Sequence, residues 1–295
     1  MQLRFISVMS MLLAFALVIC ISSCATDESY EAGSSIISGT LGELYDAEAN
    51  MTISNYGQLV VLESCEIKET KLTLPTEFSN GLKINYVGDH TFNNCDDIVE
   101  LVIPDGYEQI GHFAFNGCEN LKTVHLGKDV AYIGERAFAA APSLEKFTVS
   151  SDNPYLYEKD GCVVTKDGDV LIATNGVIPG GIKEIGASVF GGNKEISSVI
   201  IPDGTEKICG YAFAGSSLSD VLLPQSLTSI GKHVFSECNL NEIYIPKNVI
   251  DVDASVFSGI KGLVINCEVE TKPEGWSDDW LDGCEYQQIN WGAVR

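Results

Sequence analysis

Seven phenylalanines divide most of this 295-residue chain at nearly constant intervals. They are separated by 23, 23, 52, 23, 22 and 22 residues, and the interval of 52 is one of 23 with 29 residues inserted. An aliphatic residue stands five positions before each phenylalanine and glycine usually follows it, as in Ile133-Gly134. The seven positions are Phe92, Phe115, Phe138, Phe190, Phe213, Phe235 and Phe257. A period this regular indicates a repeat architecture, because each period forms one structural unit.

Each repeat also carries a short segment of alternating apolar residues, which often ends at a proline. The segments are residues 101–103, 124–126, 147–149, 199–201, 221–223, 243–245 and 263–265. Alternation with a period of two predicts a half-buried strand, and proline ends the strand because it has no N–H to donate. A unit of this length has room for the strand, two turns and about one or two turns of helix, but it cannot bury its own apolar face. Stacked units, with strands about 4.8 Å apart, would bury that face and bring the phenylalanines into one continuous spine.

The repeat pattern resembles a known family. The segments "IGHFAFNGCENLKTVHLGKDVAY" (residues 110–132) and "IGERAFAAAPSLEKFTV" (residues 133–149) are similar to the BspA-like leucine-rich repeats of bacterial surface proteins. The resemblance covers about residues 85–267. It implies an α/β-type solenoid, mostly β, with a parallel sheet on the concave face, a β-hairpin N-terminal cap and a C-terminal cap.

The remaining segments are assigned around these repeats. We expect a lipoprotein signal peptide (1–23), a lipidated flexible tether (24–45), an N-terminal capping hairpin and half repeat (46–86), about seven repeats (87–267) with an insertion near 150–180, and a C-terminal cap (268–295). Within the insertion, Asp167-Gly168 is a hairpin signal. In the final segment, Trp276, Trp280 and Trp291 are expected to cover the last repeat.

The N-terminus carries a targeting signal. An apolar run from Phe5 to Ile21 ends in "ISSC", which resembles the bacterial lipobox whose cysteine, here Cys24, is cleaved, acylated and becomes the first residue. The alternative is an uncleaved anchor helix, since 17 apolar residues approach the length needed to span a bilayer. Asp27 and Glu28 resemble the acidic surface-export signals of some outer-membrane lipoproteins. The sequence therefore predicts an outer-membrane lipoprotein displayed at the cell surface and attached to the membrane through its lipid alone.

The processed chain is strongly acidic. It would hold 17 basic and 41 acidic residues, a formal charge of −24. Long-range repulsion then disfavours nucleic acid and anionic membrane surfaces as partners. The simpler explanation, that the charge keeps an exported protein soluble, remains open beside any functional one.

His112, Cys118 and His125 have the residue types of a zinc site, but their places in the repeat argue against one. Cys118 stands three residues after its phenylalanine, as Cys95 and Cys238 do, where a small buried side chain is expected. His112 belongs to a turn and His125 to the outward side of a strand, so the three diverge. We therefore expect no metal.

Eight cysteines follow Cys24: Cys65, Cys95, Cys118, Cys162, Cys209, Cys238, Cys267 and Cys284. In an exported protein Cys95 with Cys118, and Cys267 with Cys284, are candidate disulfides. Reduced, buried thiols are the favoured alternative.

Catalytic signatures are missing from the sequence. It contains no G-x-S-x-G, H-E-x-x-H or G-x-x-x-x-G-K motif, and its four histidines are widely spread. We therefore predict a protein that is not an enzyme and needs no cofactor.

The candidate binding residues are the middle residues of the strands, which face outward. In order they are Val102, His125, Thr148, Ile200, Leu222, Tyr244 and Val264. The later ones, from Ile200 to Tyr244, would form an exposed apolar stripe on the concave face, the face through which solenoids bind. Strand propensity alone is the competing explanation.

We expect this face to bind a host or bacterial surface protein, and the family resemblance implies adhesion to host or other cells. The alternative is an accessory or scaffold subunit of an envelope complex, for example one that captures glycans.

Overall fold

The computed structural model describes residues 42–46, 51–55, 60–64, 67, 70–78 and 81–294, with residues 42–46 and 55 given as backbone only. The signal peptide (1–23), Cys24 and Cys65 lie outside these residues. Residues 42–45, assigned by sequence to the tether, belong to strand β1 (Gly42–Asp46), which pairs antiparallel with β2 (Met51–Asn55).

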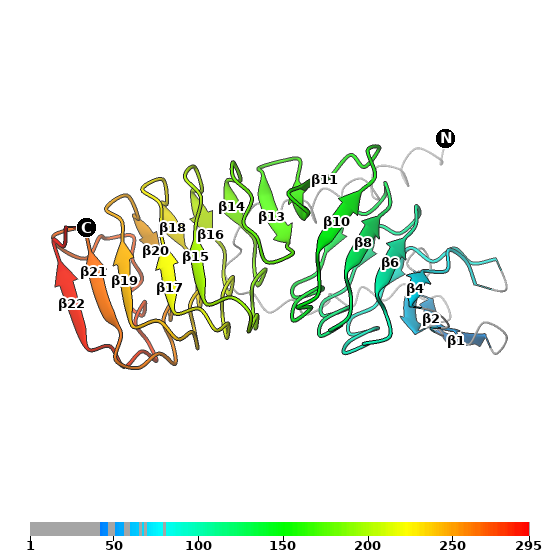
Figure 1. Cartoon of the computed structure of the whole chain (residues 1–295), viewed down its shortest axis with the longest axis horizontal. Helices are drawn as coiled ribbons and strands as arrows, with labels where there is room; N and C mark the ends of the chain where they lie inside the picture. The colour runs from blue at the N-terminus through cyan, green and yellow to red at the C-terminus, as the bar shows by residue number, and fades with distance from the viewer. Residues whose placement is uncertain are drawn as a thin grey trace, which may run out of the picture.

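The chain winds as an elongated solenoid in which each repeat adds one coil (Figure 1). One side of the coil carries the longer strands: β4 (Lys71–Thr73), β6 (Glu100–Ile103), β8 (Thr123–Leu126), β10 (Lys146–Val149), β15 (Ser198–Ile200), β17 (Asp220–Leu222), β19 (Glu242–Ile245), β21 (Val264–Cys267) and β22 (Gln288–Trp291). We call their outer surface the long-strand face. These strands pair in parallel, in the groups β4–β6–β8–β10, β15–β17 and β19–β21–β22.

A second side of the coil carries two-residue strands that include the aliphatic residue before the conserved glycine position of each repeat. They are β5 (Tyr86–Val87), β7 (Gln109–Ile110), β9 (Tyr132–Ile133), β14 (Glu184–Ile185), β16 (Lys207–Ile208), β18 (Ser229–Ile230) and β20 (Asp251–Val252). Strand β3 (Val60–Ser64) pairs antiparallel with β2 and parallel with β5, so the antiparallel pair β2–β3 extends this sheet.

The third side is built from turns, and the described residues contain no helix. The α/β description and the expected one or two helical turns per repeat are therefore wrong in this respect. The residue two positions before each of the seven phenylalanines has a φ between 53° and 59°, and the residue two positions after it also has a positive φ. Such left-handed residues interrupt a right-handed helix.

Hydrogen bonds between coils hold the turns in this conformation. The N–H of Phe113 donates to the carbonyl of Glu135 (3.1 Å), and the N–H of Phe115 donates to the carbonyl of Ala137 (2.8 Å). Because backbone groups inside a solenoid need partners, this ladder replaces the internal hydrogen bonds of a helix.

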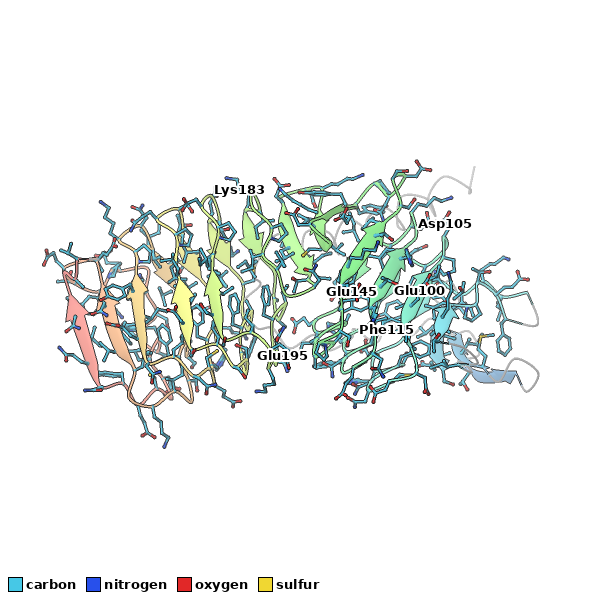
Figure 2. The ribbon with its side chains drawn as sticks, in the orientation of Figure 1. Glu100, Asp105, Phe115, Glu145, Lys183 and Glu195 are labelled. Atoms are coloured by element: carbon cyan, nitrogen blue, oxygen red, sulfur yellow. The ribbon has the colours of Figure 1, made fainter. Side chains whose placement is uncertain are left out.

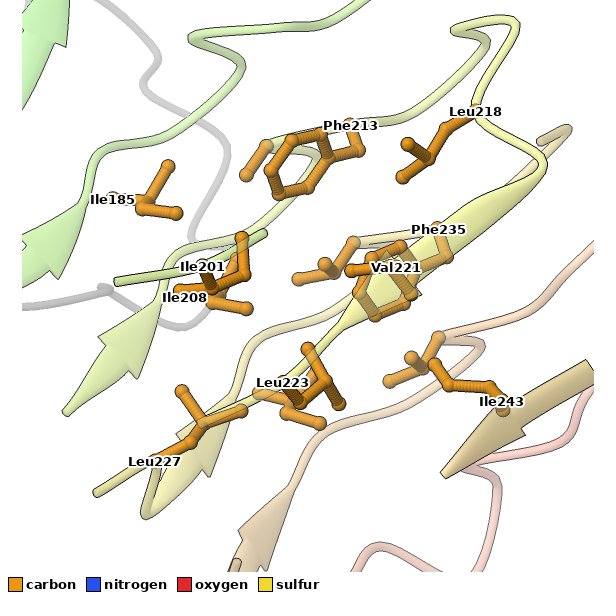
Figure 3. Close-up of a cluster of buried hydrophobic side chains, with 14 of the residues drawn as sticks. Ile185, Ile201, Ile208, Phe213, Leu218, Val221, Leu223, Leu227, Phe235 and Ile243 are labelled. Atoms are coloured by element: carbon orange, nitrogen blue, oxygen red, sulfur yellow. The ribbon is translucent and has the colours of Figure 1, made fainter. Parts of the chain in front are cut away.

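The phenylalanine spine predicted from the sequence exists, but it is divided into two stacks. Neighbouring rings are nearly parallel, with centroids 5.1 Å apart between Phe92 and Phe115 and 4.9 Å apart between Phe190 and Phe213. Figure 3 shows Phe213 and Phe235 surrounded by aliphatic side chains of the two sheets, including Ile208 and Val221. Burying such side chains contributes about 1.5–3 kcal/mol each.

The insertion divides the spine and also the core. Its strands β11 (Leu156–Lys159), β12 (Cys162–Thr165) and β13 (Val170–Ala173) form antiparallel pairs, with the expected turn at Asp167-Gly168. Every residue of β12 is buried. Val163 and Ala173 belong to the core of the N-terminal half, whereas Val164 and Leu171 belong to the core of the C-terminal half. The insertion is thus a wall between two hydrophobic cores, and Figure 1 shows β11 and β13 between β10 and β14.

The last coil ends in an aromatic cluster. Trp280 lies edge-on to Phe257 at 6.2 Å between ring centroids, and Trp276 lies 4.9 Å from Trp280. Trp291 is 6.0 Å from Trp276. The three tryptophans therefore meet at the end of the second phenylalanine stack.

No helix long and apolar enough to cross a bilayer occurs in the portion of the chain that the structure describes.

Candidate functional site

The outward positions of the long strands follow from simple alternation. In β17, Asp220 and Leu222 are exposed while Val221 between them is 4% exposed. Strand β15 pairs with β17 so that Ile200 is directly opposite Leu222. Strand β19 lies beside β17, as Figure 1 shows, with Tyr244 one repeat further along.

Three outward residues form an apolar line across neighbouring coils. Ile200 is 68% exposed, Leu222 is 37% exposed and Tyr244 is half-buried. We call these three residues the apolar ridge. Burial of each would remove apolar area from water at about 25 cal/mol per Å², and contiguous exposed apolar surface of this kind marks interaction sites.

Carboxylates line one edge of the ridge. Asp220 precedes Leu222 by two residues and Glu242 precedes Tyr244 by two, so both point outward in the neighbouring column. The hydroxyl of Ser198 donates to Asp220 Oδ2 (3.4 Å), and Nδ2 of Asn266 donates to Glu242 Oε1 (2.8 Å). The ridge therefore has a polar, acidic border.

Beyond Tyr244 the outward column becomes polar. Tyr244 pairs with Asn266, and Asn266 pairs with Asn290. Nδ2 of Asn290 donates to Oδ1 of Asn266 (2.8 Å), which continues the hydrogen bonds from Glu242. Asn266 is only 5% exposed.

The sequence prediction placed Val264 after Tyr244, and this was wrong by two residues. Val264 pairs with Glu242 instead. It still faces the same side as Asn266, because a shift of two residues preserves the alternation of a strand. The repeat length of 22 residues, carried on from Leu222 and Tyr244, points to Asn266.

The N-terminal candidates form a separate, more polar group. Val102, His125 and Thr148 are half-buried and lie directly opposite one another on β6, β8 and β10. Nδ1 of His125 is 2.7 Å from the hydroxyl of Thr148, and Nε2 is 3.4 Å from Glu100 Oε1. Glu100, labelled in Figure 2, also pairs with Lys71 at 2.6 Å, and this hydrogen-bonded ammonium lowers the pKa of its carboxyl.

The two groups of candidates are not neighbours. Strand β10 contacts the inserted strands β11 and β12, whereas β15 pairs only with β17 among the described strands. The expected continuous row from Val102 to Tyr244 is therefore broken by the insertion. Its C-terminal part keeps the apolar character.

The three residues of zinc-ligand type, His112, Cys118 and His125, have different surroundings. Cys118 is buried and its thiol donates to the carbonyl of Phe92 (3.2 Å). His112 lies in a turn, where Nδ1 accepts the N–H of Glu135 (3.1 Å). His125 lies on the long-strand face. Across the described residues, no group of three or more His, Cys, Asp or Glu side chains is arranged to hold a metal ion.

The seven described cysteines are free, so neither candidate disulfide is formed. Burial raises the pKa of the thiols of Cys118 and Cys267 to about 12, and that of Cys284 to about 11. A thiol must lose its proton to act as a nucleophile. The thiols of Cys118, Cys267 and Cys284 therefore stay protonated at neutral pH.

A small hollow opens where the two halves meet on the turn side. It has a volume of about 80 Å³ and is lined by residues that include Phe138, Pro142, Val189 and Phe190. Pockets for small-molecule ligands usually enclose about 300–1,000 Å³. This hollow is therefore smaller than most sites for small-molecule ligands.

Solved structures of bacterial leucine-rich repeat proteins are similar to this chain at low identity. A leucine-rich cell surface protein from Faecalibacterium prausnitzii is 17% identical, with 88% of this chain and 97% of that chain covered and a TM-score of 0.46. The pneumococcal vaccine antigen PcpA is 16% identical, with 86% and 99% covered and a TM-score of 0.45. A leucine-rich repeat protein from Bacteroides ovatus is 17% identical, with 86% and 76% covered and a TM-score of 0.41. No curated protein matches the sequence.

The family itself is decided by the repeats. The model described as the BspA type leucine rich repeat region matches six copies, over residues 63–159 and 173–286. The matched segments contain the two-residue strands, the phenylalanine turns and all of the long strands except β22. The insertion between them accounts for the gap. The chain belongs to the BspA-type leucine-rich repeat family.

Proposed function

We propose that this protein is a lipid-anchored surface protein of the outer membrane that binds a protein of a host or another cell through its long-strand face. The observation that carries the proposal is the apolar ridge, in which three outward side chains on consecutive coils are apolar while the alternate residues are buried or, at Val199, partly buried. Solenoids generally bind through such extended sheet faces. The absence of catalytic motifs from the sequence supports a binding role rather than an enzymatic one.

In this proposal a lipid on Cys24 anchors the protein, and the residues between Cys24 and β1 set the distance of the solenoid from the membrane. A solenoid held at that distance can present its long-strand face to a second surface. A protein that is held at the cell surface and presents an exposed apolar face is suited to adhesion, which is the activity that we propose.

Two measurements test the proposal together. Intact cells are treated with protease, and the full chain in mild detergent is then applied to an array of host matrix and bacterial surface proteins. We expect the protein to be cleaved on intact cells and to bind at least one arrayed protein. Protection from protease would contradict surface display, and recovery of envelope proteins alone would favour the envelope-complex subunit instead.

Variants then locate the binding face. Leu222→Ala with Tyr244→Ala should weaken binding at least tenfold without changing the unfolding midpoint. Ile250→Ala is the matched control, because Ile250 is 64% exposed in the same half of the molecule but lies outside the long strands. Equal binding by both variants would show that strand propensity alone explains the ridge.

A further inference from the structure

The surroundings of the apolar ridge specify what kind of protein segment it fits. We infer that the partner presents a basic, amphipathic segment, with apolar side chains that cover the ridge and Lys or Arg side chains that reach Asp220, Glu242 and Glu268. This inference rests on the proposed function and adds the chemistry of the partner to it.

The first argument is the pairing of the carboxylates. Asp220 accepts a hydrogen bond from the hydroxyl of Ser198, and Glu242 accepts one from Nδ2 of Asn266, so both of these donors are neutral. Glu268, which follows β21, accepts from Nε2 of Gln225 (3.0 and 3.1 Å) and from the N–H of Lys247 (3.1 Å). These three carboxylates thus have hydrogen-bond donors but, within the described part of the chain, no Lys or Arg side chain paired with them.

Some carboxylates elsewhere in the described part of the chain have partners of opposite charge. Lys183, labelled in Figure 2, pairs with Glu206 at 2.6 Å, and Lys261 pairs with Glu285 at 3.0 Å. Lys122 lies 3.7 Å from Glu145. The chain therefore pairs several of its surface acids with bases, and Asp220, Glu242 and Glu268 are among those for which the described residues show no such pair.

The second argument is the distribution of bases along the long-strand face. In the C-terminal half the outward residues are Ser198, Ile200, Asp220, Leu222, Glu242, Tyr244, Val264, Asn266, Gln288 and Asn290, with no Lys or Arg among them. The nearest base along the chain is Lys247, two residues past the end of β19. The N-terminal half carries Lys71 and Lys146 in the equivalent columns. The described long strands of the C-terminal half therefore present the carboxylates of Asp220 and Glu242 outward, and no Lys or Arg.

The apolar ridge and the carboxylates beside it contribute to binding in different ways. Covering the ridge supplies affinity, because it removes apolar area from water. Each exposed ion pair adds little affinity, but opposite charge raises the association rate and rejects acidic partners. An Arg side chain has a further advantage, since its guanidinium can stack on the ring of Tyr244.

The experiment uses the full chain in nanodiscs of uncharged phosphatidylcholine, with signal from empty discs subtracted. The probes are three fluorescent peptides of equal length, in which Leu alternates with Arg, Leu alternates with Glu, or Ser alternates with Arg. Binding is followed by fluorescence anisotropy at low and high salt. We expect the Leu-Arg peptide to bind at least tenfold more tightly than the other two, and its association rate to fall with salt.

Matched variants separate charge from fold. Asp220→Asn with Glu242→Gln should weaken the Leu-Arg peptide at least fivefold and reduce its salt dependence. Glu195→Gln with Glu237→Gln removes the same charge from exposed turn positions and should change binding less than twofold. Ile200→Ser should weaken binding, whereas Ile250→Ser should not.

The inference is overturned if none of the peptides binds, if the Leu-Glu peptide binds as well as the Leu-Arg peptide, or if both charge variants behave alike. Its failure is distinguishable from failure of the proposed function. If an arrayed protein binds through the ridge with an affinity that Asp220→Asn with Glu242→Gln does not change, that result would support the binding function and contradict only the inference of a basic partner.

Discussion

Val163 and Val164 are adjacent in β12, yet their side chains belong to two different hydrophobic cores. Successive side chains of a strand point to opposite faces, and here each face is covered by one half of the solenoid. The repeats on either side therefore do not share a core directly. The two halves are joined by the three-stranded sheet β11–β13. At the same place the outward residues of the long strands change from the polar group on β6, β8 and β10 to the apolar ridge on β15, β17 and β19.

Truncating the two valines should destabilise different halves. Val163→Ala and Val164→Ala each remove two buried methyl groups and should cost about 2 kcal/mol. Amide hydrogen exchange resolves the effect by segment. We expect faster exchange mainly in β6–β10 for Val163→Ala and mainly in β14–β19 for Val164→Ala, whereas an identical pattern for both variants would show a single cooperative core.

The phenylalanine stack should carry much of the stability of each half. Phe235 is fully buried and its ring lies 5.8 Å from the rings of both Phe213 and Phe257. Phe235→Ala should lower the free energy of unfolding by about 3–5 kcal/mol, as measured by urea denaturation. Phe235→Leu keeps most of the volume and should cost clearly less, and equal losses would argue against packing as the cause.

The conserved glycine position allows the coils to approach at one corner. A Cβ at Gly134 would lie 2.6 Å from the carbonyl carbon of Gly111 and 2.6 Å from the nitrogen of His112. Gly134→Ala must shift backbone and should cost about 1–3 kcal/mol. Gly180→Ala, where a Cβ meets nothing within 4 Å, is the control and should leave the unfolding midpoint nearly unchanged.

Stability should fall in alkaline solution through the buried thiols. The pKa of Cys118 and of Cys267 is about 12 in the folded chain, against 9.0 ordinarily. Folding favours the protonated thiol, so this stability is fully present below pH 9 and is lost as the pH rises toward 12. By pH 11 the loss is roughly 2–3 kcal/mol per thiol. Cys118→Ala with Cys267→Ala should flatten the slope of stability against pH between 9 and 11, and an unchanged slope would assign it to other groups.

The regular part of the fold was predictable because two periods occur together in the sequence. The spacing of Phe92, Phe115 and Phe138 gave the coil length, and the period of two in residues such as Val221 to Leu223 gave the strands and their buried side. Ile200, Leu222 and Tyr244 were placed outward on the same grounds. The hairpin at Asp167-Gly168 was predicted from turn chemistry.

Individual residues show why the structure differs from the sequence predictions. Turns replaced helix because hydrogen bonds between coils impose a left-handed backbone even on residues such as Phe113 and Tyr211, which give no sequence signal for it. The residue two positions after each phenylalanine is also left-handed, and the glycines at 117, 192, 215 and 259 were the sequence signal for it. The split core was hidden because β12 reads as an apolar run, which does not show that its two faces serve separate halves.

The central claim is that the long-strand face of the C-terminal half is the binding surface. It is tested most directly by hydrogen exchange of the full chain, alone and saturated with the arrayed protein that it binds most tightly. The account predicts slower exchange on binding in β15, β17 and β19, with the turns around Phe213 and Phe235 unchanged. Slower exchange confined to those turns, or to β6–β10, would contradict it.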